Sequence, residues 1–251
     1  MGEAIRATDI GYRYGAGWVF RNLHLKLSAG QLTAILGPNG CGKSTLLSVL
    51  SGSRTPMEGT LTSRRARLAF VPQSLETSLP FTGMDMVLLG RARSVSLFST
   101  PGQADHAAAH AALGELGIGH LADREFHVMS GGERQLVLIA RALVSKCEVL
   151  LLDEPTAALD WHHQAKVLNL LRQLADAGLA IAFTTHSPQH ALDFADRVML
   201  MTAPAQQVYG HPGQVLDEPA LSRLYRVAVR RIDLADRSLS TAVPVLRPAA
   251  R

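Results

Sequence analysis

The chain of 251 residues is poor in cysteine, and it has no long apolar run. Two cysteines, Cys41 and Cys147, are too few for a disulfide framework, which favours a reducing compartment. No apolar stretch approaches the ~20 residues needed to span a bilayer. The first residues also lack the apolar core of a signal peptide. We therefore expect a cytoplasmic protein without membrane spans of its own.

Aromatic residues and net charge are also low. Only 5% of the residues are aromatic and the net charge is +4, whereas a nucleic-acid surface needs a denser basic stripe with interleaved aromatic side chains. We therefore expect no nucleic-acid partner. Hydrophobic residues make up 47% of the chain, enough for one large core with a smaller attached subdomain.

A phosphate-binding loop is present at residues 37–44, which follow the spacing G-x-x-x-x-G-K-[ST]. The apolar run 31–36 before it predicts a buried strand, and residues 44–51 after it predict a helix. Glycines let successive backbone N–H groups point at an anion, and the helix N-terminus adds partial positive charge. Lys43 would reach the β- and γ-phosphates of a nucleotide, and Ser44 would offer its hydroxyl to Mg²⁺.

A second apolar run, 149–152, predicts a central parallel strand that ends at Asp153 and Glu154. Because ligands bind at the carboxyl ends of parallel strands, both carboxylates should emerge beside the phosphates. Asp153 suits Mg²⁺ through a water, and Glu154 suits polarisation of the attacking water. The two motifs together predict nucleotide hydrolysis.

Ser130 and Glu133 form an S-x-x-E capping box ahead of the apolar segment 136–143. The two glycines between them, Gly131 and Gly132, let a phosphate approach the exposed N–H groups of the helix start. A capped helix is ordinary by itself. It does not explain why a second anion-receptive helix start lies just upstream of the acidic strand end.

In this order and number, the motifs resemble those of the ATP-binding cassette (ABC) ATPases, over about residues 5–213. The matched motifs are the Walker A loop at 37–45, the Q-loop at Gln73, the signature at 130–133, the Walker B end at 153–154, the D-loop at 158–160, the switch histidine His186 and the adenine-stacking Tyr14. Tyr12, two residues before Tyr14, is a weaker candidate for the adenine-stacking role.

The resemblance implies an α/β fold, a P-loop NTPase cassette with a RecA-like parallel-sheet core, an N-terminal antiparallel β part and a helical signature subdomain. We expect one ABC ATPase domain over residues 1–251. Its nucleotide-binding core would comprise 1–74 and 149–215, its helical subdomain 75–148, and a short C-terminal extension 216–251.

The resemblance also implies an ATPase that uses ATP and Mg²⁺ as a head-to-tail homodimer, each ATP lying between the Walker A loop of one copy and the signature of the other. The expected catalytic residues are Lys43, Gln73, Glu154 and His186, and those expected at Mg²⁺ are Ser44, Gln73 and Asp153. The expected nucleotide contacts are Tyr14, Gly37, Asn39, Gly40, Gly42, Lys43, Ser44 and Thr45, with Ser130, Gly132 and Asp160 from the partner copy.

Two departures from the family pattern lie in the signature. Met129 stands where leucine is usual, and Glu133 stands where glutamine is usual. Both keep the capped helix start, but the negative charge of Glu133 near a phosphate could slow closure of the dimer. After the switch histidine, Ser187 and Pro188 replace the aspartate of many importers; as N-cap and first helical residue they should still begin a helix cleanly.

Within the family, the chain resembles the ATPases of importers for vitamin B12, haem and ferric siderophores, and more closely the molybdate/tungstate ATPase of that group. The implied partners are a multi-spanning permease dimer, docked at about Ser74–Arg93, and indirectly a periplasmic or lipoprotein substrate-binding protein. The chain would then be peripheral on the cytoplasmic face of the inner membrane. A soluble ABC ATPase of iron–sulfur cluster assembly, which has similar length and motifs, is the alternative. The segments that carry the subgroup resemblance are 70–73, 85–91, 124–126, 134–142 and 184–186.

Overall fold

The computed structural model describes residues 2–63, 67–75, 79–92, 100–157, 159–234 and 239–245. Its centre is a six-stranded sheet in the order β5-β6-β7-β3-β8-β9, in which only the β8–β9 pair is antiparallel. β3, β6 and β7 are buried along their whole length, as expected of strands covered on both faces. The strands are β3 (Leu32–Leu36), β5 (Leu68–Val71), β6 (Val149–Leu152), β7 (Ala180–Thr185), β8 (Arg197–Ala203) and β9 (Gln206–Gly210).

A three-stranded antiparallel sheet, ordered β2-β1-β4, lies on one side of the central sheet. Its strands are β1 (Glu3–Tyr14), β2 (Gly17–Ser28) and β4 (Glu58–Ser63), and α1 (Lys43–Leu50) lies with them. Leu23, Leu25 and Leu27 of β2 alternate with exposed residues and share one apolar core with Leu46 and Leu47 of α1. This core fixes the helix that follows the phosphate loop.

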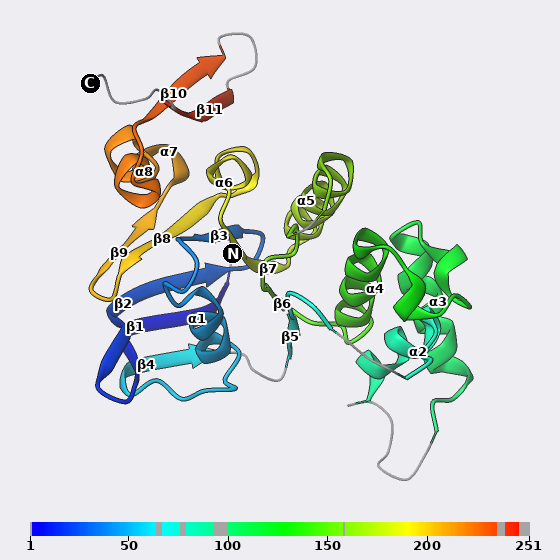
Figure 1. Ribbon diagram of the computed structural model, residues 1–251. Helices are drawn as coiled ribbons and strands as arrows, with labels where there is room; N and C mark the ends of the chain where they lie inside the picture. Colours follow the sequence, from blue (N-terminus) through cyan, green and yellow to red (C-terminus); the bar gives the residue numbers. More distant parts are fainter. Residues whose placement is uncertain are drawn as a thin grey trace.

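Helices cover the other face of the central sheet and form a lobe beside its β5 edge (Figure 1). In that lobe α4 packs against α2, α3 and β5, so the helix that begins at the signature joins the lobe to the sheet. The helices are α2 (Gly83–Leu88), α3 (Gln103–Glu115) and α4 (Gly131–Leu143) of the lobe, its 3-10 turns Leu89–Arg91, Gly119–Leu121 and Phe126–Val128, and α5 (Trp161–Asp176) and α6 (Pro188–Phe194) over the sheet.

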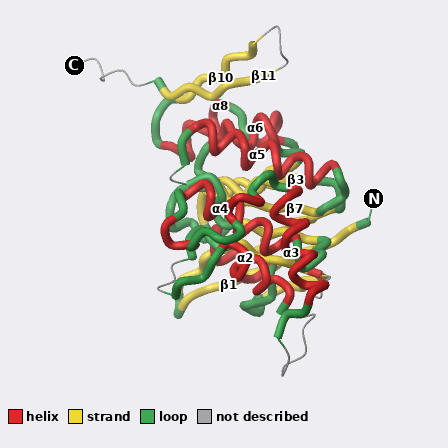
Figure 2. Tube along the Cα trace, turned by 90° about the vertical axis from the view of Figure 1, so that its right-hand side faces the viewer, coloured by secondary structure: helices red, strands yellow, loops and turns green. Residues whose placement is uncertain are grey.

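The C-terminal part adds α7 (Pro212–Val215), α8 (Glu218–Tyr225) and an antiparallel hairpin of β10 (Val229–Leu234) and β11 (Leu239–Pro244). β10 packs against α8 and β11 packs against α6, and Figure 2 shows the hairpin beyond both helices. The predicted α/β fold, with a parallel core, an antiparallel N-terminal part and a helical subdomain, is confirmed.

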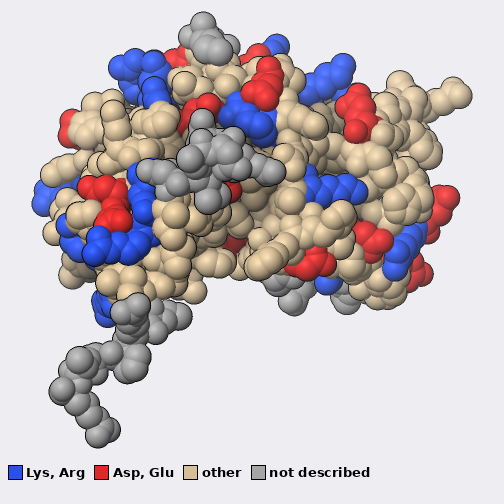
Figure 3. Space-filling model, turned by 90° about the horizontal axis from the view of Figure 1, so that it is seen from above, with Lys and Arg blue, Asp and Glu red and all other residues tan. Residues whose placement is uncertain are grey.

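The surface carries charges of both signs. On the face seen in Figure 3, lysines and arginines are interspersed with acidic side chains. One ion pair of the chain joins Arg230 to Glu218 at 2.9 Å. Among the described residues, no helix combines the length and the apolar character that crossing a membrane requires.

Candidate nucleotide site

The phosphate loop connects the carboxyl end of β3 to α1 and borders a cavity of about 360 Å³. Gly42, the N-cap of α1, has φ 103°, and a Cβ there would lie 2.3 Å from Cγ1 of Val19. Backbone conformation and packing therefore both require glycine at this position. The residues that line the cavity are Asn39, Gly40, Gly42, Lys43, Ser44, Thr45, Gln73 and Glu154.

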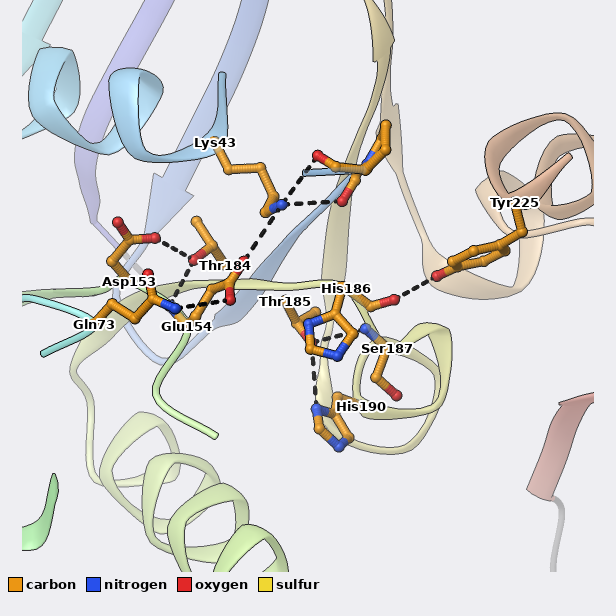
Figure 4. A network of polar contacts seen from close by, with 12 residues as sticks. Lys43, Gln73, Asp153, Glu154, Thr184, Thr185, His186, Ser187, His190 and Tyr225 are labelled. Carbon is orange, nitrogen blue, oxygen red and sulfur yellow. Dashed lines mark hydrogen bonds and ion pairs between the residues drawn. The ribbon is translucent and has the colours of Figure 1, made fainter. Parts of the chain in front are cut away.

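Three predicted catalytic side chains meet at this cavity from three different elements (Figure 4). Nζ of Lys43, whose side chain is only 5% exposed, donates to the carbonyl of Gly37 at 3.0 Å and lies 3.5 Å from Oε1 of Glu154. Nε2 of Gln73 donates to Oε2 of the same glutamate at 3.3 Å. In this arrangement, the glutamate carboxylate is the anion that Lys43 faces.

Thr184 of β7 holds the two carboxylates that follow β6. Its Oγ1 accepts the backbone N–H of Glu154 at 2.7 Å and donates to Oδ1 of Asp153 at 2.6 Å. Glu154 has φ 43°, a left-handed conformation that costs a non-glycine residue of order 1 kcal/mol. In the sequence, Thr184 stands out only as part of the segment 184–186 that resembles the importer group. Its role as the support of both carboxylates is not predicted by any motif.

The donor set around the loop suits Mg²⁺. Ser44 presents an exposed hydroxyl at the start of α1, and the buried Asp153 and the amide of Gln73 supply further oxygens. Mg²⁺ prefers such oxygen ligands and is usually held by one or two carboxylates together with water and substrate phosphates. Among the described residues, no group of three His, Cys, Asp or Glu side chains is placed to hold a metal.

Tyr14 lies at the end of β1 beside the phosphate loop, with its hydroxyl 3.5 Å from Oγ1 of Thr45. Its side chain is 52% exposed, whereas Tyr12 is buried and its hydroxyl accepts from Arg54. The Arg54 guanidinium lies 5.2 Å from the centre of the Tyr14 ring. The exposed ring can therefore stack on a base, and the buried one cannot.

The signature begins α4 with the predicted capping box. The Ser130 hydroxyl accepts the backbone N–H of Glu133, and the Glu133 carboxylate accepts the backbone N–H of Ser130 at 2.7 Å. That same carboxylate lies 2.9 Å from Nη1 of Arg124. The hydrogen bond from the Ser130 backbone, with Arg124 adding to it, lowers the pKa of Glu133. The extra charge that distinguishes this signature is thus compensated within the chain, and Met129 is buried in the core.

Asp160, the last residue of the predicted D-loop, caps α5 and contacts His163, which lies against Gly132 of the signature. Its carboxylate accepts the backbone N–H of His163 at 2.9 Å and pairs with Nδ1 of that ring, and the backbone hydrogen bond lowers the pKa of Asp160. A Cβ on Gly132 would lie 2.6 Å from Cδ2 of His163. Ala158 of the predicted D-loop lies outside the described residues.

The two halves of the predicted site do not share one cavity. The described lining of the phosphate cavity contains no residue of the signature or the D-loop. Gly131 and Leu159 border a different cavity of about 210 Å³, which Gln73 also lines. Within a single chain the phosphate loop and Gly131 of the signature therefore line two different cavities, with Gln73 common to both.

His186 follows β7 with its side chain exposed, and α6 begins at Pro188 with Ser187 as N-cap, as predicted. Nδ1 of His190 lies 3.3 Å from Oγ1 of Thr185 and 3.4 Å from Oγ1 of Thr156. Burial, and secondly the charge of His186, lowers the pKa of His190. The ring of His190 thus joins the segment after the Walker B end to the segment before the switch histidine.

A groove of about 440 Å³ lies between the β5 edge strand and the lobe. Phe70 and Leu89, 40% and 45% exposed, are among its lining residues, together with Arg141. Arg91, expected at a docking surface, instead turns inward to Asp105 at 3.0 Å and is 18% exposed. Residues 76–78 and Arg93 of the predicted docking segment lie outside the described residues.

Comparison with protein families identifies this arrangement. Residues 20–157 match the model of the family described as ABC transporter. The chain belongs to the ABC transporter family. It is therefore an ATP-binding cassette, and the predicted enzyme class, an ATPase coupled to transport, is confirmed.

Two similar relatives are named as import ATP-binding proteins. The molybdate import ATP-binding protein MolC of Haemophilus influenzae is 38% identical over 90% of this chain and 90% of its own. The hemin import ATP-binding protein HmuV of Thermobifida fusca is 35% identical over 96% of this chain and 87% of its own. A solved structure described as a metal-chelate type ABC transporter in an inward-facing conformation is 36% identical, with a TM-score of 0.91 over 98% of both chains. The resemblance to this importer group is confirmed.

Proposed function

We propose that this chain is the ATP-hydrolysing motor subunit of an importer for a metal chelate or a metal oxyanion. The substrate classes are a ferric siderophore, haem or vitamin B12 on one side and molybdate or tungstate on the other. The observation that carries the proposal is the likeness over 98% of both chains to a metal-chelate type transporter. The iron–sulfur assembly alternative is not favoured, because the similar relatives are import proteins.

The hydrolytic site would be built on the phosphate loop. Lys43 would leave Glu154 and contact the β- and γ-phosphates of ATP, while the loop N–H groups cradle them. Glu154 would accept a proton from the attacking water, and Gln73 and His186 would contact the γ-phosphate region. Tyr14 would stack on adenine.

The oxygens of Ser44, Gln73 and Asp153 would hold Mg²⁺ beside the phosphates. Bound there, the ion would supply positive charge that offsets the negative charge developing on the phosphate oxygens. Thr184 would keep Asp153 oriented, because its hydroxyl donates to that carboxylate at 2.6 Å.

A second copy of the chain would complete the site. Ser130, Gly132 and Asp160 would come from the partner, since the described lining of the phosphate cavity has no contribution from them. ATP would then lie between two copies, and its hydrolysis would release them. Within each copy we propose a core of residues 1–74 and 149–215, a helical subdomain of 75–148 and an extension of 216–251.

The groove between β5 and the lobe would receive a cytoplasmic segment of a multi-spanning permease. Its exposed Phe70 and Leu89 suit an amphipathic segment, and Arg141 suits an acidic residue on it. Gln73 follows Phe70 of this groove by three residues and lines the phosphate cavity, so the γ-phosphate contact and the permease contact would lie on one short stretch of chain. The chain would thereby be held at the cytoplasmic face of the membrane, with a substrate-binding protein acting through the permease.

Purification of the tagged chain from detergent-solubilised membranes, in the presence of Mg-ATP, tests this proposal. We expect a multi-spanning permease to be recovered, and expect less of it with Leu89→Asp than with Met57→Asp. Leu89 is 45% exposed and Met57 is 55% exposed, and Met57 lies outside both the groove and the segment 74–93. Reconstituted in vesicles with its binding protein, the complex should take up molybdate, tungstate or hemin in an ATP-dependent way. Recovery only of soluble, cysteine-rich assembly proteins would contradict the importer.

A further inference from the structure

The last residue of α8 contacts the backbone of the switch histidine. The Tyr225 hydroxyl donates to the carbonyl oxygen of His186 at 2.6 Å, across 39 positions of sequence (Figure 4). The phenol is partly buried against the main apolar core, and this burial raises its pKa, so it remains a donor at any ordinary pH. The contact joins the C-terminal extension directly to the predicted site.

The extension holds Tyr225 in a fixed place. The Asp217 side chain caps the start of α8, and Arg226, with φ 54°, ends the helix in the left-handed conformation. The backbone N–H of Val229 then donates to Oγ of Ser222 at 2.9 Å, which ties β10 to the helix. The Glu218 carboxylate accepts from the backbone N–H of Arg231 at 2.9 Å and adds a second tie.

The switch segment is held by its backbone, since the His186 side chain is exposed. The backbone N–H of Ser187 donates to Oγ1 of the buried Thr185 at 3.0 Å. The His186 carbonyl, which belongs to the same peptide unit, accepts from Tyr225. The two bonds fix the plane of the peptide that follows the Cα of His186, and so restrict the direction in which its ring can point.

We propose that Tyr225 is a positioning residue for hydrolysis: it fixes the His186 carbonyl so that the His186 ring meets the γ-phosphate in the closed dimer. The inference rests on the proposed role of His186. It gives the C-terminal extension a part in turnover, although none of the described extension residues lines the phosphate cavity. Tyr225 acts on the rate of the chemical step and leaves nucleotide binding to the phosphate loop.

A matched control exists in the same chain. The Tyr209 hydroxyl of β9 donates to the carbonyl of Lys26 at 2.5 Å, and this phenol is also partly buried. Tyr225→Phe and Tyr209→Phe therefore each remove one hydroxyl-to-carbonyl hydrogen bond, but only the first removes it from the switch segment. General loss of stability should affect both variants alike.

The experiment compares ATP turnover of the two variants with wild type at 15 °C, where circular dichroism verifies that each is folded. For Tyr225→Phe we expect kcat to fall about three- to tenfold with KM for ATP within twofold, because one oriented hydrogen bond is lost. Tyr209→Phe should retain wild-type kcat. Equal losses of kcat in both variants, or a rise in KM without a fall in kcat, would overturn the proposal.

A double-mutant cycle separates this inference from the function on which it rests. His186→Ala should lower kcat strongly, and adding Tyr225→Phe to it should change kcat no further. If His186→Ala turns over like wild type, the proposed role of the switch histidine fails. If His186→Ala is impaired but Tyr225→Phe is not, or if their effects simply multiply, the positioning role alone fails.

Discussion

The pair between Lys43 and Glu154 leads to a prediction with two parts. Glu154→Gln should lower ATP turnover by roughly two to four orders of magnitude, because glutamine cannot take a proton from the attacking water. The same change should tighten nucleotide binding, because Lys43 no longer faces a carboxylate that competes with the phosphates.

The magnitude of the second effect follows from the geometry. The two charged groups lie 3.5 Å apart with side chains 5% and 16% exposed. Two unit charges at such a distance interact by roughly 4 kcal/mol at an effective dielectric constant of about 20. Desolvation offsets much of that attraction. We therefore take about 1–2 kcal/mol as the net free energy by which the Lys43–Glu154 pair weakens nucleotide binding, which corresponds to roughly 5- to 30-fold in affinity.

Phosphate release measures the first effect, and equilibrium binding of Mg-ADP measures the second. ADP is the better probe of affinity because it lacks the γ-phosphate and so does not add closure of the dimer. Glu148→Gln, just before the same strand, is the control and should leave both quantities near wild type. Wild-type turnover in Glu154→Gln would refute the general-base role, and unchanged or weaker ADP binding would refute the competition for Lys43.

Three further predictions address other parts of the site. Burial raises the pKa of the Cys41 thiol in the phosphate loop, so alkylation of this thiol should be slow at pH 7 and faster at pH 9. Alkylation should inhibit ATP hydrolysis, and bound ATP should prevent it. Equal inactivation with and without ATP would count against the phosphate loop as the nucleotide site. Gly132→Ala should lower the free energy of unfolding by about 1–3 kcal/mol, because the added Cβ would overpack against His163. In the same denaturation experiment Gly131→Ala should cost less, because its Cβ would lie 3.5 Å from its nearest neighbour. His190 has a folded-state pKa below its unfolded value, so its contribution to stability is complete above about pH 6.5 and is lost as the pH falls toward the folded pKa. His190→Asn should therefore show a smaller drop in thermal midpoint between pH 7.5 and 5.5 than wild type, and an equal drop would contradict the assignment.

The fold could be predicted from local signals because each one has a short-range physical cause. The apolar run 149–152 is a buried strand and the S-x-x-E box does begin α4. Ser187 and Pro188 begin α6 for the same kind of reason. In each case the residues that specify the element lie within a few positions of it.

The contacts that connect distant segments could not be predicted in this way. Thr184 supports both carboxylates from a neighbouring strand, and Tyr225 reaches His186 from the C-terminal extension. Arg91 was expected at a docking surface, yet its partner Asp105 lies in the next helix and draws the guanidinium inward. No periodicity or motif in one sequence encodes such pairings, because they depend on how the helices and strands pack.

The composite site underlies every functional proposal above, and mixing two inactive variants tests it most directly. Lys43→Ala disables the phosphate loop and Ser130→Ala disables the signature, so each homodimer would have two defective sites. A heterodimer of the two would have one site with both halves intact. We expect neither variant alone to hydrolyse ATP appreciably. In an equal mixture that pairs at random, about half of the dimers are heterodimers with one intact site of two, so we expect the mixture to recover at most about a quarter of wild-type activity. A mixture as inactive as its components would contradict a site shared between two copies of this chain.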